Sequence, residues 1–135
     1  MATTTAQLKL DSAAGSLLTS VVAIDDTMTL YDYGTTTGMT KTTGLARLTI
    51  AAATETKLLD ASDYSSTKGH QLYIKNTEAS GTETVKITVG DVGSSKELGY
   101  LGFDEWSLIP WGGNEDINIT CTSASTIVEW MLIFE

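Results

Sequence analysis

The chain has 135 residues, 41% of them hydrophobic and 19% charged, and its 17 acidic and 8 basic side chains give a formal net charge of -9. This composition excludes a disordered or collagen-like chain, and the length suits one domain with its own core. The lysines are scattered singly, so the basic stripe needed to bind nucleic acid or an anionic membrane is missing, and one cysteine cannot form an internal disulfide. We expect one domain, 1–135, with no nucleic-acid or membrane partner.

Threonine is the most informative residue type, because 23 residues are threonine and many of them alternate with valine, isoleucine and leucine. A β-branched side chain is restricted at χ1 and fits a pleated, half-buried surface better than a helical turn. Apolar stripes of helical period with matching caps are not found over any useful length. The sequence therefore predicts an all-β fold.

The N-terminal third is predicted to be irregular, with strand-like pieces where apolar and polar residues alternate around Leu8 and Leu10 and again over 27–31. Residues 1 to about 16 are expected to form an extended segment outside the sandwich. They lack a charged region followed by an apolar one, so we expect synthesis in a cytoplasm without a secretion signal.

A Gly/Thr-rich stretch at 34–44 contains three glycines and six threonines without an apolar period. This composition is typical of an exposed loop or a flexible extension. Neither this stretch nor the N-terminal segment can bury a core alone, yet they carry apolar side chains at Leu8, Leu10 and Met39. We therefore expect both to contact a partner.

From residue 45 the alternation of apolar and polar residues is steadier. The stretches at 70–76 and 83–89 are expected to form a hairpin, and the strand that begins at 105 is expected to end before Pro110. The final stretch is apolar on both faces, which predicts a central strand. About eight to ten short strands at this spacing are typical of an antiparallel β-sandwich or barrel. The predicted strands here are 45–53, 56–59, 70–76, 83–89, 97–101, 105–109, 117–121 and 126–134.

Side chains that usually carry catalysis are scarce, with one histidine, one cysteine and one arginine. His70 opens a predicted strand, where a loop-edge position is expected rather than a general base held by an orienting partner. Cys121 shares the apolar parity of Ile117 and Ile119, which predicts a buried thiol. The sequence contains no Gly-x-Ser-x-Gly elbow. We expect a non-enzymatic protein.

Several carboxylates lie close together in the sequence, but none has the spacing of a known calcium loop. Carboxylates in turns usually cap backbone N–H groups. We therefore expect neither a metal site nor a cofactor. The nearest pairs are Asp25 with Asp26, Asp60 with Asp63, and Asp104 with Glu105.

Three tryptophans, Trp106, Trp111 and Trp130, lie in the last quarter of the chain. Exposed aromatic rings stack on sugars in many carbohydrate-binding modules, whereas buried ones form a core or a subunit interface. Trp130 is expected in the core, and both readings stay open for Trp111. A carbohydrate-binding module would hold Trp111 and Tyr64 exposed and coplanar. A small hydrolase would instead need a pocket with two convergent acids.

Several short motifs carry a family resemblance that covers most of the chain. They are Met-Thr-Leu-Tyr at 28–31 leading into Gly-Thr-Thr-Thr-Gly at 34–38, Leu-Tyr-Ile-Lys-Asn-Thr at 72–77, Leu-Gly-Tyr-Leu-Gly at 98–102 with Glu105 and Trp106, Ile-Pro-Trp at 109–111, and the final strand at 128–135. Together these segments resemble small virion structural proteins of tailed bacteriophages, particularly those that infect marine cyanobacteria.

The resemblance implies a jelly-roll-like β-sandwich present in many copies, a decoration, or cement, protein on the outer face of the capsid, made in the cytoplasm of the host bacterium. The implied partners are the major capsid protein and further copies of the chain, with a trimer preferred. An acidic surface suits the outer capsid face, because packaged DNA would repel it inside. A tail, neck or fibre-associated virion protein is the near alternative. The candidate contact residues are Leu8, Leu10, Tyr31, Tyr33, Met39 and Trp111.

Overall fold

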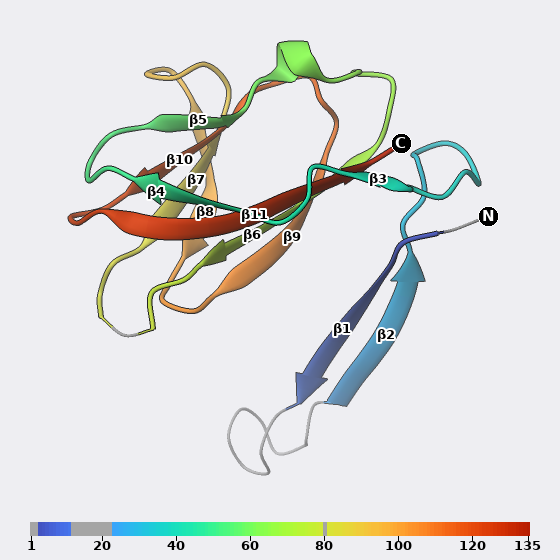
Figure 1. Ribbon diagram of the computed structural model, residues 1–135, viewed down its shortest axis with the longest axis horizontal. Coiled ribbons are helices and arrows are strands. Elements are labelled where there is room, and N and C mark those ends of the chain that lie inside the picture. Colours follow the sequence, from blue (N-terminus) through green and yellow to red (C-terminus); the bar gives the residue numbers. More distant parts are fainter. Residues whose placement is uncertain (1–2, 12–22, 80) are drawn as a thin grey trace.

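The computed structural model describes residues 3–11, 23–79 and 81–135, and Figure 1 shows a sandwich of strands from which a hairpin projects. The described residues form eleven strands and one short 3-10 helix, η1, at Ala61–Asp63. The fold class is therefore all-β. The strands are β1 Thr5–Asp11, β2 Ala23–Thr29, β3 Lys41–Thr42, β4 Ala46–Ile50, β5 Thr56–Leu59, β6 His70–Asn76, β7 Val85–Val89, β8 Lys96–Leu101, β9 Trp106–Trp111, β10 Ile117–Cys121 and β11 Thr126–Phe134.

Two antiparallel sheets make up the sandwich. In the first, called the β11 sheet, the strand order is β3-β11-β6-β9, and β4 also pairs with β11; in the second, called the β10 sheet, the order is β5-β10-β7-β8. Counted in chain order from β4 to β11, the β11 sheet holds the first, eighth, third and sixth strands, and the β10 sheet the second, seventh, fourth and fifth. This interleaved order is that of a jelly roll, so the expected jelly-roll-like sandwich is confirmed.

The core lies between the two sheets, where alternate side chains of both sheets point inward. Leu132 and Ile119 are fully buried there. Burial of each such side chain contributes about 1.5–3 kcal/mol to stability. Cys121 is also fully buried, as its parity predicts, and this burial raises the pKa of the thiol.

Strand β11 is central, as its two apolar faces predict, because it pairs with β3, β4 and β6. On its inner face Val128 and Leu132 are fully buried in the sandwich core. On its outer face Met131 and Ile133 belong to a second apolar cluster. Strand β11 thus contributes side chains to the sandwich core on one face and to an outer apolar surface on the other. This outer surface faces the N-terminal hairpin, the name used here for β1 and β2.

Two expectations for the middle of the chain are wrong. Strands β6 and β7 form no hairpin, because β6 lies in the β11 sheet and β7 in the β10 sheet. Buried Asn76, at the end of β6, donates from Nδ2 to the carbonyl oxygens of Glu83 (3.2 Å) and Leu101 (3.4 Å), and so ties the crossing chain to the second sheet. Strand β9 runs through Pro110 to Trp111. A proline is tolerated there because β9 is an edge strand.

One carboxylate closes the turn between β10 and β11. Glu83 accepts hydrogen bonds from the hydroxyl (2.7 Å) and backbone N–H (2.7 Å) of Ser123, the hydroxyl of Thr122 (2.8 Å) and the backbone N–H of Ala124 (2.9 Å). These bonds, with those from Ser123 the largest contribution, lower the pKa of Glu83 from 4.5 to about 2. The turn is therefore held by an ionised acid.

We predict that Glu83→Gln lowers the melting temperature at pH 7 and weakens the acid sensitivity of the fold. Because the pKa of Glu83 is lower in the folded chain than the ordinary 4.5, its stabilisation is complete above pH 4.5 and disappears as the pH falls toward 2. The difference in melting temperature between wild type and variant should therefore shrink over this range. Calorimetry from pH 2 to pH 7 measures it. Glu115→Gln, at an exposed carboxylate, is the control, and a pH-independent difference would contradict the assignment.

Candidate functional site

The N-terminal hairpin is amphipathic. Its register places Ala6 opposite Met28 and Leu10 opposite Ile24, so these side chains and Leu8 share one face. On that face Leu8 is 43% exposed and Met28 is 49% exposed. A two-stranded hairpin is at best marginally stable in water. Contacts with the sandwich therefore have to hold it in place.

The end of the hairpin where Leu30 and Met39 lie, called the hairpin root, packs on the outer face of the β11 sheet. Leu30, Met39 and Ile133 are buried together there, and Met131 packs against them. This corrects the expectation that 34–44 is simply an exposed loop. Its glycines and threonines are mostly exposed, but Met39 anchors it from within and β3 pairs with the end of β11.

A buried carboxylate ties the same root to the loop before β6. Asp32 accepts hydrogen bonds from the backbone N–H of Gly69 (2.6 Å) and from Lys68 Nζ (3.0 Å). These two bonds, with that of Gly69 the larger contribution, lower the pKa of Asp32. The approach is close, because a Cβ on Gly69 would lie 2.8 Å from the backbone nitrogen of Tyr33. The root and this loop are therefore held together by polar as well as apolar contacts.

Beyond the root, the hairpin and the outer face of the β11 sheet enclose an open groove of about 1040 Å³, called the hairpin groove. Strand β1 contributes the consecutive residues 6–10, and β9 contributes 106–108. Figure 1 shows β1 on the side of the hairpin that faces β9. Trp106 is 52% exposed, and its ring lies beside that of Tyr73, with the centroids 6.4 Å apart. The walls are mainly apolar and partly open to solvent.

Charged side chains also line the groove. They are Asp26, Asp104, Glu105 and Lys9, so acids outnumber bases there, as in the whole chain. Asp104 forms an ion pair of 2.7 Å with Lys75. The groove therefore combines an apolar surface with an acidic character, which suits an apolar segment that carries basic groups.

Four of the six predicted contact residues are exposed. Leu8 and Leu10 come together on one wall of the hairpin groove. Tyr31 and Tyr33 are 49% and 57% exposed on the segment that leaves β2, outside the residues that line the groove. The structure thus brings the two leucines into a common site and leaves the two tyrosines beside it.

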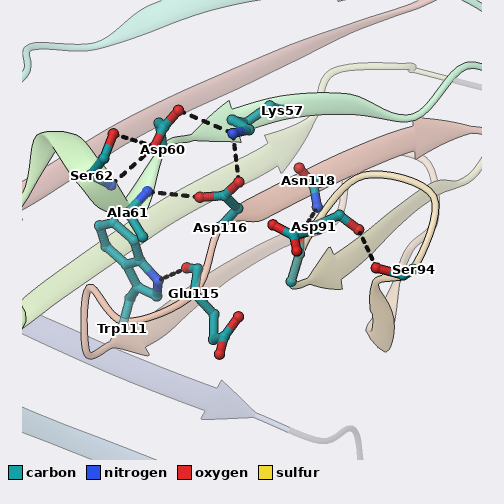
Figure 2. A network of polar contacts seen from close by, with 11 residues as sticks. Lys57, Asp60, Ala61, Ser62, Asp91, Ser94, Trp111, Glu115, Asp116 and Asn118 are labelled. Atoms are coloured by element: carbon teal, nitrogen blue, oxygen red, sulfur yellow. Dashed lines mark hydrogen bonds and ion pairs between the residues drawn. The ribbon is translucent and has the colours of Figure 1, made fainter.

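The prediction is corrected for Met39 and Trp111, which lie inside the chain and are not accessible to a partner. Trp111 is 7% exposed, and its Nε1 donates to the carbonyl oxygen of Glu115 at 2.9 Å (Figure 2). The ring meets Tyr64 edge-on, with centroids 5.3 Å apart and planes at 76°. The exposed, coplanar pair that would mark a carbohydrate-binding module is therefore not formed.

The expectation for His70 is also corrected. It is not at an exposed loop edge but 3% exposed at the start of β6. Its ring lies among the aromatic rings of Tyr64, Trp111 and Phe134. Burial is the main cause that lowers the pKa of His70, which keeps it neutral at pH 7. His70 therefore packs as one ring of this aromatic cluster.

The carboxylates near η1 act as capping groups, as predicted for Asp60. Asp60 accepts from the Oγ (2.7 Å) and backbone N–H (2.9 Å) of Ser62, and these two bonds are the main cause that lowers its pKa to about 2. Lys57 Nζ lies 3.0 Å from Asp60 and 2.6 Å from Asp116 (Figure 2).

Among the described residues, no group of three or more His, Cys, Asp or Glu could hold a metal ion. In the same part of the chain, no helix is long and apolar enough to cross a membrane.

Sequence reasoning missed the sheet side of the hairpin groove, which Tyr73, Trp106, Leu108 and Met131 help to form. One signal was present in the sequence. The final strand is apolar on both faces, so its outer row needs a cover. The pattern does not say that the hairpin supplies part of that cover.

Comparison with protein-family models and with curated proteins finds no match. Among solved structures, the chain is similar to one from a study titled "Bacillus endospore appendages form a novel family of disulfide-linked pili". The two chains are 17% identical, the alignment covers 74% of this chain and 94% of that one, and the TM-score is 0.46. A likeness this distant carries no inference about function.

We predict that Asp32→Ala loosens the hairpin root without unfolding the sandwich, because the N–H of Gly69 and the ammonium group of Lys68 lose their shared acceptor. Hydrogen exchange by mass spectrometry should show amides in 28–40 exchanging roughly tenfold faster or more, while β11 keeps its protection. Gly69→Ala should act in the same direction through its close approach. Asp63→Ala, at an exposed position of η1, is the control. Equal loss of protection in β11 would contradict a local role.

Proposed function

We propose that this chain is a non-enzymatic structural protein that works by holding a neighbouring protein subunit in the hairpin groove. The observation that supports this proposal is the groove itself, which has apolar walls that remain half-exposed. Leu8 and Met28 on one wall and Trp106 on the other are each between 43% and 52% exposed. A sizeable apolar patch of this kind, edged by polar groups, is typical of a protein interaction site.

Within this class, we propose a virion decoration protein that binds the major capsid protein on the outer face of the capsid. The resemblance of the sequence to small virion proteins supports this version. The net charge of -9 suits a surface that faces away from packaged DNA. Ordering a partner segment costs about 1–2 kcal/mol per residue in backbone entropy, so several copies acting together, a trimer in our proposal, would offset it.

Attachment to a tail, neck or fibre would use the same groove and is the second version of this proposal. The two versions differ in which particle component binds. We do not propose a carbohydrate-binding module, because the reading depended on an exposed, coplanar pair, whereas Trp111 is buried, Tyr64 is half-buried and the two rings meet edge-on.

We predict that purified chain binds undecorated capsids and raises their heat resistance, and that Leu8→Lys weakens this binding at least about tenfold. The change places a charge on the apolar wall, where a buried leucine is worth about 1.5–3 kcal/mol. Co-sedimentation and thermal release of DNA measure the two effects. Leu45→Lys is the matched control, since Leu45 is 61% exposed and lies outside the groove.

Each other outcome has a defined meaning. Binding to tails instead of capsids would favour the second version. Equal loss of binding in the Leu45→Lys control would show that the groove is not the part of the chain that binds. Retention on a glycan array together with no binding to any particle component would overturn the structural role.

A further inference from the structure

The hairpin groove exposes the edge of a strand as well as apolar faces. Successive side chains of a β-strand point to opposite faces, so one face supplies every second residue to a surface. Strand β1 instead lines the groove with residues 6–10 in succession. Its edge therefore faces the groove. Among the described residues, β1 pairs only with β2.

The hydrogen bonds at the hairpin root indicate which backbone groups of β1 point toward that edge. The N–H of Leu30 donates to the carbonyl of Thr4 at 2.9 Å. These two residues are the next pair in the register that runs from Thr5 opposite Thr29. In an antiparallel pair, bonded and non-bonded positions alternate along the strands. The backbone N–H and C=O of Gln7, three residues on from Thr4, therefore point away from β2.

The hairpin is also one strand short of a self-supporting sheet. Two strands alone are marginal in water, whereas three strands with an apolar face that packs on a second layer are stable. The apolar face of the hairpin already packs on the β11 sheet at its root through Ala6, which contacts the cluster that contains Ile133. A third strand beside β1 would extend this face over Leu108 and Trp106, which line the opposite wall.

We propose that the hairpin groove binds one extended strand of a different protein, which pairs antiparallel or parallel with the open edge of β1 and carries basic residues at its ends. This inference rests on the proposed function and names the form of the partner segment. The incoming strand lays alternate apolar side chains on Leu108 and Trp106. Its basic ends meet the acids Asp26 and Glu105.

Charge is the reason that the occupant is a different protein rather than a second copy. The lining residues include three acids and one base, and each chain carries a net charge of -9. A second copy would bring further negative charge to an acidic groove, whereas a segment with basic ends is electrostatically complementary. The backbone of the added strand supplies affinity and its side chains supply specificity, as in other cases of strand addition.

The test uses a short blocked peptide, Lys-Thr-Val-Thr-Val-Thr-Lys, added to the full chain and followed by amide hydrogen exchange in NMR spectra. We expect the amide of Gln7 to exchange at least about tenfold more slowly with the peptide bound. The same peptide with all backbone nitrogens methylated should give no protection. A version with glutamate in place of both lysines should bind at least about tenfold more weakly. Leu8→Lys should abolish the effect, and Leu45→Lys should retain it.

A tethered version keeps the test decisive if the free peptide binds weakly. The side chain of the final residue, Glu135, accepts a hydrogen bond from the hydroxyl of Thr40 at 3.1 Å, so the end of β11 lies beside the hairpin root. A peptide fused there through a flexible Gly/Ser linker reaches an effective concentration in the millimolar range, about what short linkers give. Unchanged exchange at Gln7 in this fusion would overturn the proposal.

Three further results of the exchange experiments would also overturn it. Protection of Trp106 and Leu108 amides in place of Gln7 would mean that the strand pairs with β9. Equal protection by the methylated peptide would mean that only side chains bind. Protection of Gln7 by concentrated protein without peptide would make a second copy the occupant. Capsid binding without protection of Gln7 would overturn this inference alone, whereas peptide binding without capsid or tail binding would overturn the proposed function alone.

Discussion

Everything in this fold depends on a single strand, β11, being apolar on both faces. Its inner row, with Val128 and Leu132, closes the sandwich core, and its pairing with β4, β3 and β6 holds most of one sheet together. Its outer row, with Met131 and Ile133, is the surface on which the hairpin root is packed. A polar residue at either outer position would leave the inner row of the sandwich core in place but remove the apolar surface on which the hairpin packs. The hairpin groove therefore depends on Met131 and Ile133, the apolar side chains on the outer face of the central strand.

The hairpin is positioned by two kinds of contact that act at the same place. Apolar packing of Leu30 and Met39 against Ile133 holds the hairpin on the sheet but does not fix its orientation, because the hydrophobic effect is non-directional. The carboxylate of Asp32 fixes the orientation, because it accepts hydrogen bonds from the backbone N–H of Gly69 and from the ammonium group of Lys68. The groove begins beyond this root. The groove is therefore fixed at one end and lined by half-exposed side chains along its length.

The sequence predicts well which residues form a strand and which side chains share a face, but it predicts poorly which strands pair with each other. The bounds of β5, β6, β10 and β11 follow from alternating or continuous runs of apolar residues, which are local and directly visible in the sequence. Pairing is not local, which is why β6 and β7 were joined in prediction and separated in the structure. Met39 was hidden because its neighbours are glycines and threonines, and only tertiary packing distinguishes it from them. Half of the groove could be foreseen from Leu8 and Leu10, whereas its sheet side required the strand order.

The interleaved strand order also has a kinetic meaning. In the β11 sheet, β4 has no neighbour until β11 is made, and β6 has at most one edge satisfied by β9 before then. The β10 sheet similarly waits for β10 to join β5 to β7. A nascent chain on the ribosome therefore carries several incomplete sheet edges until its last strand emerges, and folds dominated by such distant pairings form slowly. The N-terminal hairpin, by contrast, pairs two strands that are close in the chain, although its seat on Ile133 is synthesised last. The hairpin groove is thus completed only after the whole sandwich has closed, so a partially synthesised chain cannot form it.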